Sequence, residues 1–181
     1  FSCNYFIYLI KKGLKVKNYD KFFFLSLLFF LFTIIFFYRI AEHGTDRSAQ
    51  ILIFLLIIEL LFIINFEKGI RENIVKISII LGLVISLKSF YILYLALILP
   101  VLYYFLIDKK FNNILLIFKN YFFYFFLLLF SNVLFVNFAN SGCLIYPVSI
   151  TCFDYFSWSI PLQEVSAMND WYEQWSKAGA N

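Results

Sequence analysis

Long runs of apolar side chains constrain this chain more than any other feature. Four stretches, residues 22–38, 49–66, 74–107 and 114–136, contain few polar interruptions. About 20 helical residues cross a bilayer, where backbone polar groups must be satisfied within helices or closed barrels. The chain is 63% hydrophobic, whereas soluble domains average roughly 45–50% apolar residues. The sequence therefore predicts an all-α integral membrane protein.

The stretch 74–107 is too long for one upright span, and it contains Lys88 near its middle. A split at Lys88 gives spans at 74–87 and 89–107. The positively charged residues then divide unequally between the two sides, as expected when cytoplasmic loops collect Lys and Arg. The inner side would hold Lys11, Lys12, Lys15, Lys17, Lys21, Lys68, Arg71, Lys76, Lys109, Lys110 and Lys119, and the outer side Arg39, Arg47, Lys88 and Lys177.

Without the split, Lys109, Lys110 and Lys119 would move outside and the asymmetry would shrink. We therefore expect about five transmembrane helices, near residues 22–38, 49–66, 74–87, 89–107 and 114–136, in a region covering 1–137. The 14-residue span 74–87 would rise only about 21 Å, so it must be short, distorted or re-entrant. Residues 1–21 would be cytoplasmic and 138–181 extracytoplasmic. The opening "FSCNYFIYLI" resembles the inner end of a helix, and we expect a fragment of a longer polytopic protein.

The last part of the chain differs in composition. Residues 138–160 mix Gly, Pro, Ser and aromatic side chains, which suits a folded loop at the outer face. A helix is expected at about 161–178, with Pro161 in its first turn. One face of this helix would carry Val165, Met168, Tyr172 and Trp175. Trp and Tyr favour the headgroup region, so we predict an interfacial helix.

The segment "AEHGTDR" gathers charged side chains at the end of the first span. Glu42, His43 and Asp46 could bind a divalent metal, leaving Arg39 and Arg47 to hold phosphate. The alternative is an ordinary solvated loop, with Thr45 or Asp46 as the N-cap of the next helix.

Two charged residues within the apolar stretches also need an explanation. Lys88 is costly unless it snorkels or faces a cavity, so it either marks a loop or points toward an anion such as a lipid phosphate. Glu59 lies in the middle of its span and is either functional or paired with a neighbouring helix from a part of the protein outside this sequence.

Two cysteines, Cys143 and Cys152, lie close together in "GCLIYPVSITCF" on the side expected to be oxidising. This position favours a disulfide, with two free buried thiols as the alternative. Cys3 lies near the inner face without a partner. The sequence contains no CxxC, Walker or GxGxxG motif, and its one His has no matched Ser or Cys arrangement for a nucleophilic triad. The basic segment "KKGLKVKNYDK" fits contact with anionic lipid, and no nucleic acid partner is expected.

Several segments, "YRIAEHGTDRSAQIL", "SLKSFYILYLAL", "NSGCLIYPVSITCF", "WSIP" and "WYEQWSKA", resemble a family of bacterial polytopic membrane proteins. That family looks like the GT-C superfamily of membrane glycosyltransferases, which act in cell-surface polysaccharide or lipid-linked sugar chemistry. The resemblance implies a bacterial inner membrane location and a polyprenyl-phosphate-linked sugar as partner, besides membrane lipids.

The resemblance also implies site residues. Arg47, Lys88, Asp46 and His43 would bind the donor phosphate. The catalytic carboxylate is expected upstream of Phe1, so no catalytic residue is assigned in this sequence. The resemblance does not decide whether a divalent metal is a cofactor. Two alternatives remain: a transporter or flippase of lipid-linked sugars that depends on Glu59, and a non-catalytic assembly subunit.

Overall fold

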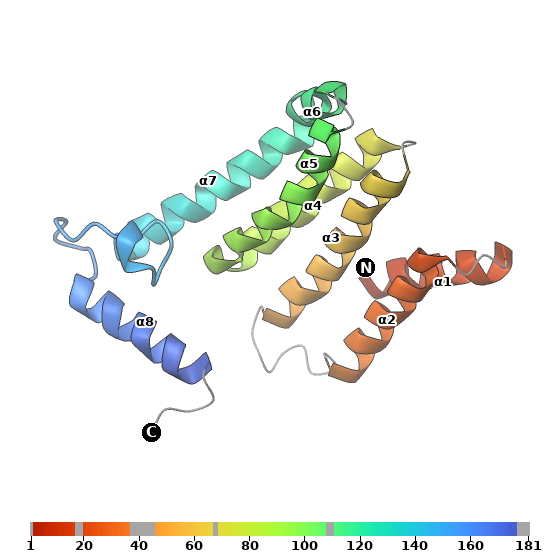
Figure 1. Cartoon of the computed structure of the whole chain (residues 1–181). Helices are drawn as coiled ribbons and strands as arrows, with labels where there is room; N and C mark the ends of the chain where they lie inside the picture. The colour runs from red at the N-terminus through yellow and green to blue at the C-terminus, as the bar shows by residue number, and fades with distance from the viewer. Residues whose placement is uncertain (1, 17–19, 37–45, 67–68, 108–110, 177–181) are drawn as a thin grey trace.

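The computed structural model describes residues 2–16, 20–36, 46–66, 69–107 and 111–176 (Figure 1). Helices make up the regular structure in these ranges, which contain no strand. Their bounds are α1 (Ser2–Val16), α2 (Lys21–Phe36), α3 (Asp46–Asn65), α4 (Ile70–Leu87), η2 (Ser89–Ile98), α5 (Leu99–Ile107), α6 (Phe111–Phe118), α7 (Tyr121–Ser141), η3 (Ser149–Thr151) and α8 (Leu162–Ser176). The all-helical prediction is confirmed.

Three helical segments in the described part of the chain are long and apolar enough to cross a membrane: Asp46–Asn65, Phe90–Ile107 and Tyr121–Ser141. The break expected at Lys88 is present, because α4 ends at Leu87 and η2 begins at Ser89. The expected span 74–87 was too short. Helix α4 begins at Ile70, after Gly69 in the left-handed conformation (φ 80°), and its 18 residues rise about 27 Å.

The expected span 114–136 was wrong, since α6 ends at Phe118 and α7 begins at Tyr121. Asn120 between them has an extended backbone, and its side-chain oxygen accepts a hydrogen bond of 3.0 Å from the Phe122 backbone N–H. This N-cap starts a new helix within one apolar run. Helix α7 also continues to Ser141, so the loop expected from residue 138 begins at Gly142.

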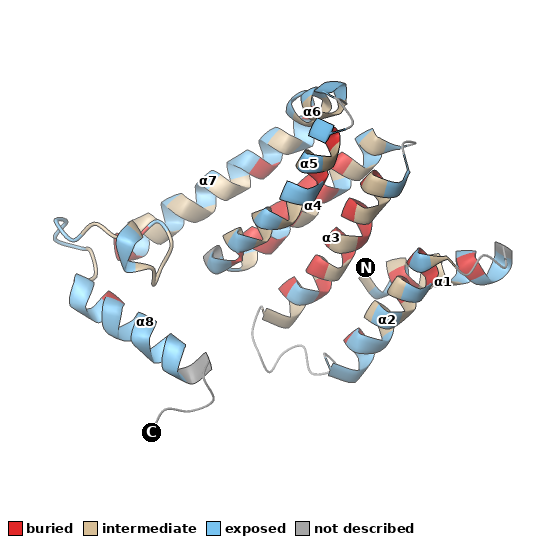
Figure 2. Ribbon diagram, viewed as in Figure 1, coloured by how far each residue is buried: buried red, intermediate tan, exposed pale blue. Residues whose placement is uncertain are grey.

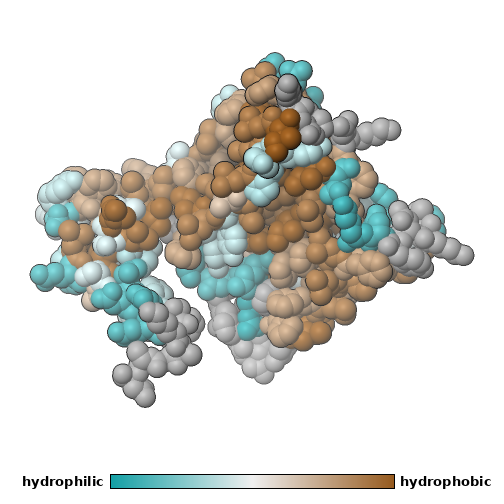
Figure 3. Space-filling model, viewed as in Figure 1, coloured by the Kyte–Doolittle hydropathy of each residue, from teal (hydrophilic) through white to brown (hydrophobic). Residues whose placement is uncertain are grey.

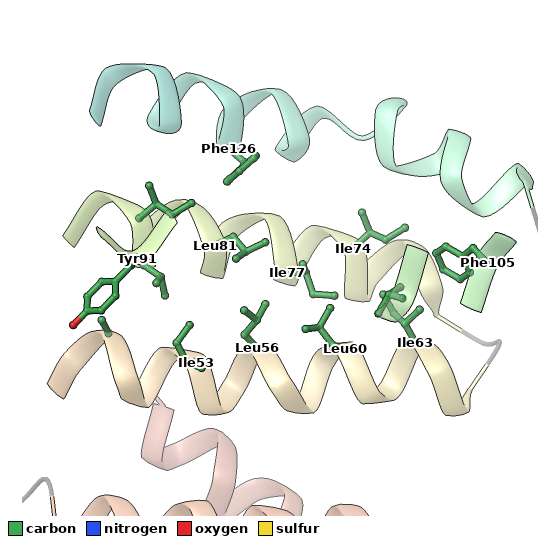
Figure 4. Close-up of a cluster of buried hydrophobic side chains, with 14 residues drawn as sticks. Ile53, Leu56, Leu60, Ile63, Ile74, Ile77, Leu81, Tyr91, Phe105 and Phe126 are labelled. Atoms are coloured by element: carbon green, nitrogen blue, oxygen red, sulfur yellow. The ribbon is translucent and has the colours of Figure 1, made fainter. Parts of the chain in front are cut away.

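The main core lies between α3 and α4 (Figure 4). Side chains three and four positions apart form the facing stripe of each helix, as amphipathic packing requires. On α3 this stripe is Ile53, Leu56, Leu60 and Ile63, and on α4 it includes Ile74, Ile77 and Leu81. After the break at Lys88 the chain turns back, so that Phe105 of α5 lies beside Ile74 and Ile63 (Figure 4).

Helix α7 packs on the other side of α4, where Gly82 allows a close approach. A Cβ at Gly82 would lie 2.9 Å from Leu129 Cδ1 and 3.8 Å from the Cα of Phe126. Small residues at such contacts let two helix backbones approach closely. Helix α7 runs in the same direction as α4, so its C-terminal end lies on the side where α4 ends (Figure 4).

Helices α1 and α2 form a second unit against α3. Phe6 of α1 is fully buried with Ile51, Leu55 and Ile58 of α3, and Phe29 of α2 stacks on Phe54 at 4.4 Å. Burial therefore concentrates on α3, while α2, α5 and α7 present large apolar side chains outward (Figure 2). Figure 3 shows apolar side chains over much of the visible helical surface and hydrophilic ones over α8. Soluble monomers rarely expose such extended apolar surface.

The loop after α7 is fixed by a disulfide between Cys143 and Cys152, the pair considered in the sequence. Gly142 (φ 77°) starts this loop, and a Cβ there would lie only 2.5 Å from Ser159 Cβ. Phe138 at the end of α7 makes edge contacts with Phe153, Phe156 and Trp158. Cys3 is exposed and unpaired.

Helix α8 follows this loop and corresponds to the helix expected at 161–178, although residues 177–181 lie outside the described part. Of the expected apolar face, Val165 is buried, whereas Met168 and Tyr172 are exposed. Trp171 is exposed as well. This distribution leaves an aromatic surface on α8 uncovered.

The α4–α7 contact gives a first prediction. Gly82→Leu should separate the two helices and lower the thermal midpoint in detergent micelles by several degrees, because overpacking costs about 1–3 kcal/mol. Gly82→Ala should be tolerated, since only the mobile methyl end of Leu129 has to move. Leu83→Ala, at an exposed neighbouring position, is the matched control. An unchanged midpoint in Gly82→Leu would contradict close α4–α7 packing.

Candidate functional site at the end of α4

The candidate site forms where the chain reverses between α4 and η2. Lys88 has an extended backbone (φ −160°, ψ 129°), which ends α4, and its carbonyl accepts a 3.0 Å hydrogen bond from the Tyr91 N–H. A lysine at this break avoids the cost of a cation within an apolar helix. The break thus places the Lys88 and Tyr91 side chains beside the first residue of α3, Asp46.

Three side chains meet at this position. The Lys88 Nζ lies 3.1 Å from Asp46 Oδ1 and 3.4 Å from Oδ2. The Tyr91 hydroxyl donates a 2.7 Å hydrogen bond to Asp46 Oδ1. The sequence singled out Asp46 and Lys88 but missed Tyr91, which follows Lys88 at the spacing of one helical turn. We call these residues the Asp46 cluster.

The Asp46 cluster is accessible. The Lys88 side chain is 46% exposed and the Asp46 side chain 41%, while Tyr91 is largely buried. Ion pairs with this exposure contribute about 0–1 kcal/mol, so a competing anion can displace Asp46 from Lys88 at little cost. The apolar packing of α3 and α4, not the ion pair, holds the two charges in place.

The structure describes only some of the other residues that the sequence predicted for the site. Arg47 follows Asp46 on α3 and is partly buried. Arg39, Glu42 and His43 lie outside the described residues. Of the metal-binding set proposed from the sequence, only Asp46 is described, and the described ranges contain no group of three His, Cys, Asp or Glu that could hold a metal ion.

A second polar cluster surrounds Glu59, which is only 1% exposed. The Tyr5 hydroxyl donates a hydrogen bond to Glu59 Oε1, and the Lys76 Nζ lies 3.3 Å from Oε1 and 3.4 Å from Oε2. Lys76 also lies 5.7 Å from the centre of the Tyr5 ring. Helices α1, α3 and α4 thus each contribute one side chain. The sequence suggested a partner helix outside this sequence, whereas the partners of Glu59 are Tyr5 on α1 and Lys76 on α4.

The two clusters are separate. Asp46 and Glu59 are 13 residues apart on α3, which corresponds to about 20 Å along the helix axis. Glu59 is therefore not part of the Asp46 cluster, and the two require separate tests.

Comparison with known proteins defines the family of the chain. A family model described as a domain of unknown function (DUF8201) matches residues 1–180. The chain belongs to this family. No curated protein matches the chain, and no solved structure matches it either. Functional arguments therefore depend on the residues themselves.

The Glu59 cluster gives a second prediction. Lys76→Met should destabilise the folded state by about 3 kcal/mol, because it leaves a buried carboxylate without its cation. This is the low end for a broken buried pair, since the Lys76 side chain is 45% exposed. Glu59→Gln combined with Lys76→Met should recover much of this loss. Unfolding in mixed micelles, followed by circular dichroism, measures both effects. Equal stability of Lys76→Met and the unsubstituted chain would contradict the buried pair.

Proposed function

We propose that the chain is a multi-pass membrane protein that binds the phosphate of a polyprenyl-phosphate-linked sugar at the Asp46 cluster, as part of a GT-C-like glycosyltransferase. The proposed location is a bacterial inner membrane, with Lys11, Lys12 and Lys15 toward the cytoplasm and 138–181 extracytoplasmic. The three long apolar helices and the uneven distribution of Lys and Arg support this placement. The expected cytoplasmic placement of all of residues 1–21 does not fit, because Phe6 of α1 packs against Ile51, Leu55 and Ile58 within the α3 span.

The observation that carries the proposal is the position of Lys88. Its ammonium lies at a helix break, nearly half exposed, with Asp46 as an exchangeable partner. An arriving phosphate would find a cation already oriented, and Tyr91 offers a hydroxyl donor beside it. Arg47, on the next position of α3, could add a bidentate contact.

The chemistry proposed for such a site requires few protein groups. A carboxylate deprotonates the acceptor hydroxyl, and cations stabilise the negative charge of the departing phosphate. Lys88 and Arg47 would supply the second of these functions. Asp46 would hold Lys88 in position before the donor binds.

A transporter of the same lipid-linked sugars is the second candidate. The observation that favours it is the buried charge of Glu59 beside Lys76, because ionisable groups inside a membrane often mark a transport path. Transport would depend on Glu59, whereas donor binding at the Asp46 cluster would not. Sugar-lipid flux into vesicles measured for Glu59→Gln therefore separates the two candidates.

The membrane placement predicts which positions are accessible from outside. In a Cys3→Ser background, a cysteine at Ile150 should react with an impermeant maleimide in intact cells, because this side chain is 92% exposed in the loop after α7. Cysteines at Lys15 and Arg71 should react only after the membrane is permeabilised. Labelling of Arg71→Cys in intact cells would contradict the proposed orientation.

The phosphate site predicts that Lys88→Gln and Arg47→Lys each weaken binding of a short-chain polyprenyl-phosphate hexose about tenfold. Lys88→Gln removes a cation, and Arg47→Lys removes the planar guanidinium that can make two hydrogen bonds to one phosphate. Each lost charge-assisted hydrogen bond is worth about 1.5–3 kcal/mol. Binding can be measured with the purified chain in micelles. Arg71→Lys, at the other end of α4, is the matched control. If both variants bind the sugar lipid as the unsubstituted chain does, the phosphate site is refuted.

A further inference from the structure

A cavity of about 600 Å³ lies far from the Asp46 cluster, between α1, the start of α2, the end of α3 and the start of α4. One wall is aromatic, with Phe22 stacked on Phe62 at 4.3 Å and Phe66 beside them. Another part of the lining is charged and includes Lys12, Glu72 and Lys76. Its volume is in the range of about 300–1,000 Å³ that is typical of ligand sites. The lining therefore suits an amphiphilic ligand.

Two of the charged groups in the lining already have partners. Asp20 accepts hydrogen bonds from the backbone N–H groups of Phe22 and Phe23, at 3.1 and 3.0 Å, and so caps α2. Lys76 neutralises the buried Glu59. The Lys76 side chain is nevertheless 45% exposed, so this cation also faces the cavity.

The remaining charges of the lining are Lys12 and Glu72, both exposed. Neither has an ion-pair partner among the described residues. The cavity thus presents one uncompensated positive and one uncompensated negative charge. A purely anionic headgroup would satisfy Lys12 but leave Glu72 unmatched, and an uncharged headgroup would satisfy neither. A ligand with both a phosphate and an ammonium group matches both charges.

We propose that this cavity binds an aminophospholipid, whose headgroup is a phosphate diester bearing a primary ammonium. The phosphate contacts Lys12 and the exposed side of Lys76, and the ammonium contacts Glu72. The acyl chains lie along the wall formed by Phe22, Phe62 and Phe66. The proposal relies on the membrane placement argued above but not on the sugar-phosphate site, since Phe66 and Asp46 are separated by about 30 Å along α3.

Native mass spectrometry of the purified chain in micelles can test this site with short-chain lipids. Dihexanoyl phosphatidylethanolamine should bind more tightly than dihexanoyl phosphatidylglycerol. Lys12→Gln and Glu72→Gln should each weaken phosphatidylethanolamine binding about three- to fivefold, the effect expected for one accessible ion pair. Lys11→Gln and Arg71→Gln are matched controls at adjacent positions that do not line the cavity. Both should bind as the unsubstituted chain does.

Four results would overturn the proposal. Equal binding of phosphatidylglycerol would exclude a role for the ammonium group, as would unchanged phosphatidylethanolamine affinity in Glu72→Gln. Unchanged affinity in Lys12→Gln would exclude the phosphate contact. Equally tight binding of water-soluble glycerophosphoethanolamine would exclude a lipid as the ligand. Lys88→Gln should leave phosphatidylethanolamine binding intact. Failure of the lipid proposal is therefore distinguishable from failure of the sugar-phosphate site.

Discussion

The reversal of the chain at Lys88 is the constraint on which the rest of the structure depends. A continuous helix from Ile70 to Ile107 would place its two ends about 55 Å apart and leave a lysine in its apolar middle. The break instead lets Phe105 pack beside Ile74 and Ile63. It also brings Tyr91 to the Asp46 carboxylate, where Lys88 already lies because α4 packs along α3. The packing of α5 beside α3 and α4 and the Tyr91 contact in the candidate site both follow from this one turn.

The two polar clusters differ in how strongly they contribute to the fold. The Lys88–Asp46 pair is exposed, so its contribution to stability is about 0–1 kcal/mol and its partners can be exchanged. The Glu59 carboxylate is buried, and loss of Lys76 would leave it uncompensated. An accessible pair suits ligand binding, whereas the buried pair links α3 to α4 and, through Tyr5, to α1. Lys76 and Tyr5 both contact the buried Glu59 carboxylate and line the open cavity.

The sequence predicted the helical class because long apolar runs indicate membrane helices. It predicted the break at Lys88 because only a split there keeps most Lys and Arg residues on one side. It did not predict the break at Asn120. This break depends on a side-chain hydrogen bond that caps α7, and the apolar residues on both sides of Asn120 give no sign of it. The pairing of Glu59 with Lys76 and Tyr5 was also missed. Glu59 and its two partners lie on three different helices, and only packing brings them together. Asp46 and Lys88 were each identified, but their contact spans 42 positions and requires α4 to pack back along α3.

The distance between residues 70 and 107 tests the reversal most directly. Spin labels at Ile70→Cys and Ile107→Cys, in a Cys3→Ser background, allow this distance to be measured by pulsed electron spin resonance in lipid nanodiscs. Packed neighbouring helices lie about 8–10 Å apart, so the reversed chain predicts a distance below about 25 Å even with the label linkers. A distance near 55 Å, as for one continuous helix, would contradict the account.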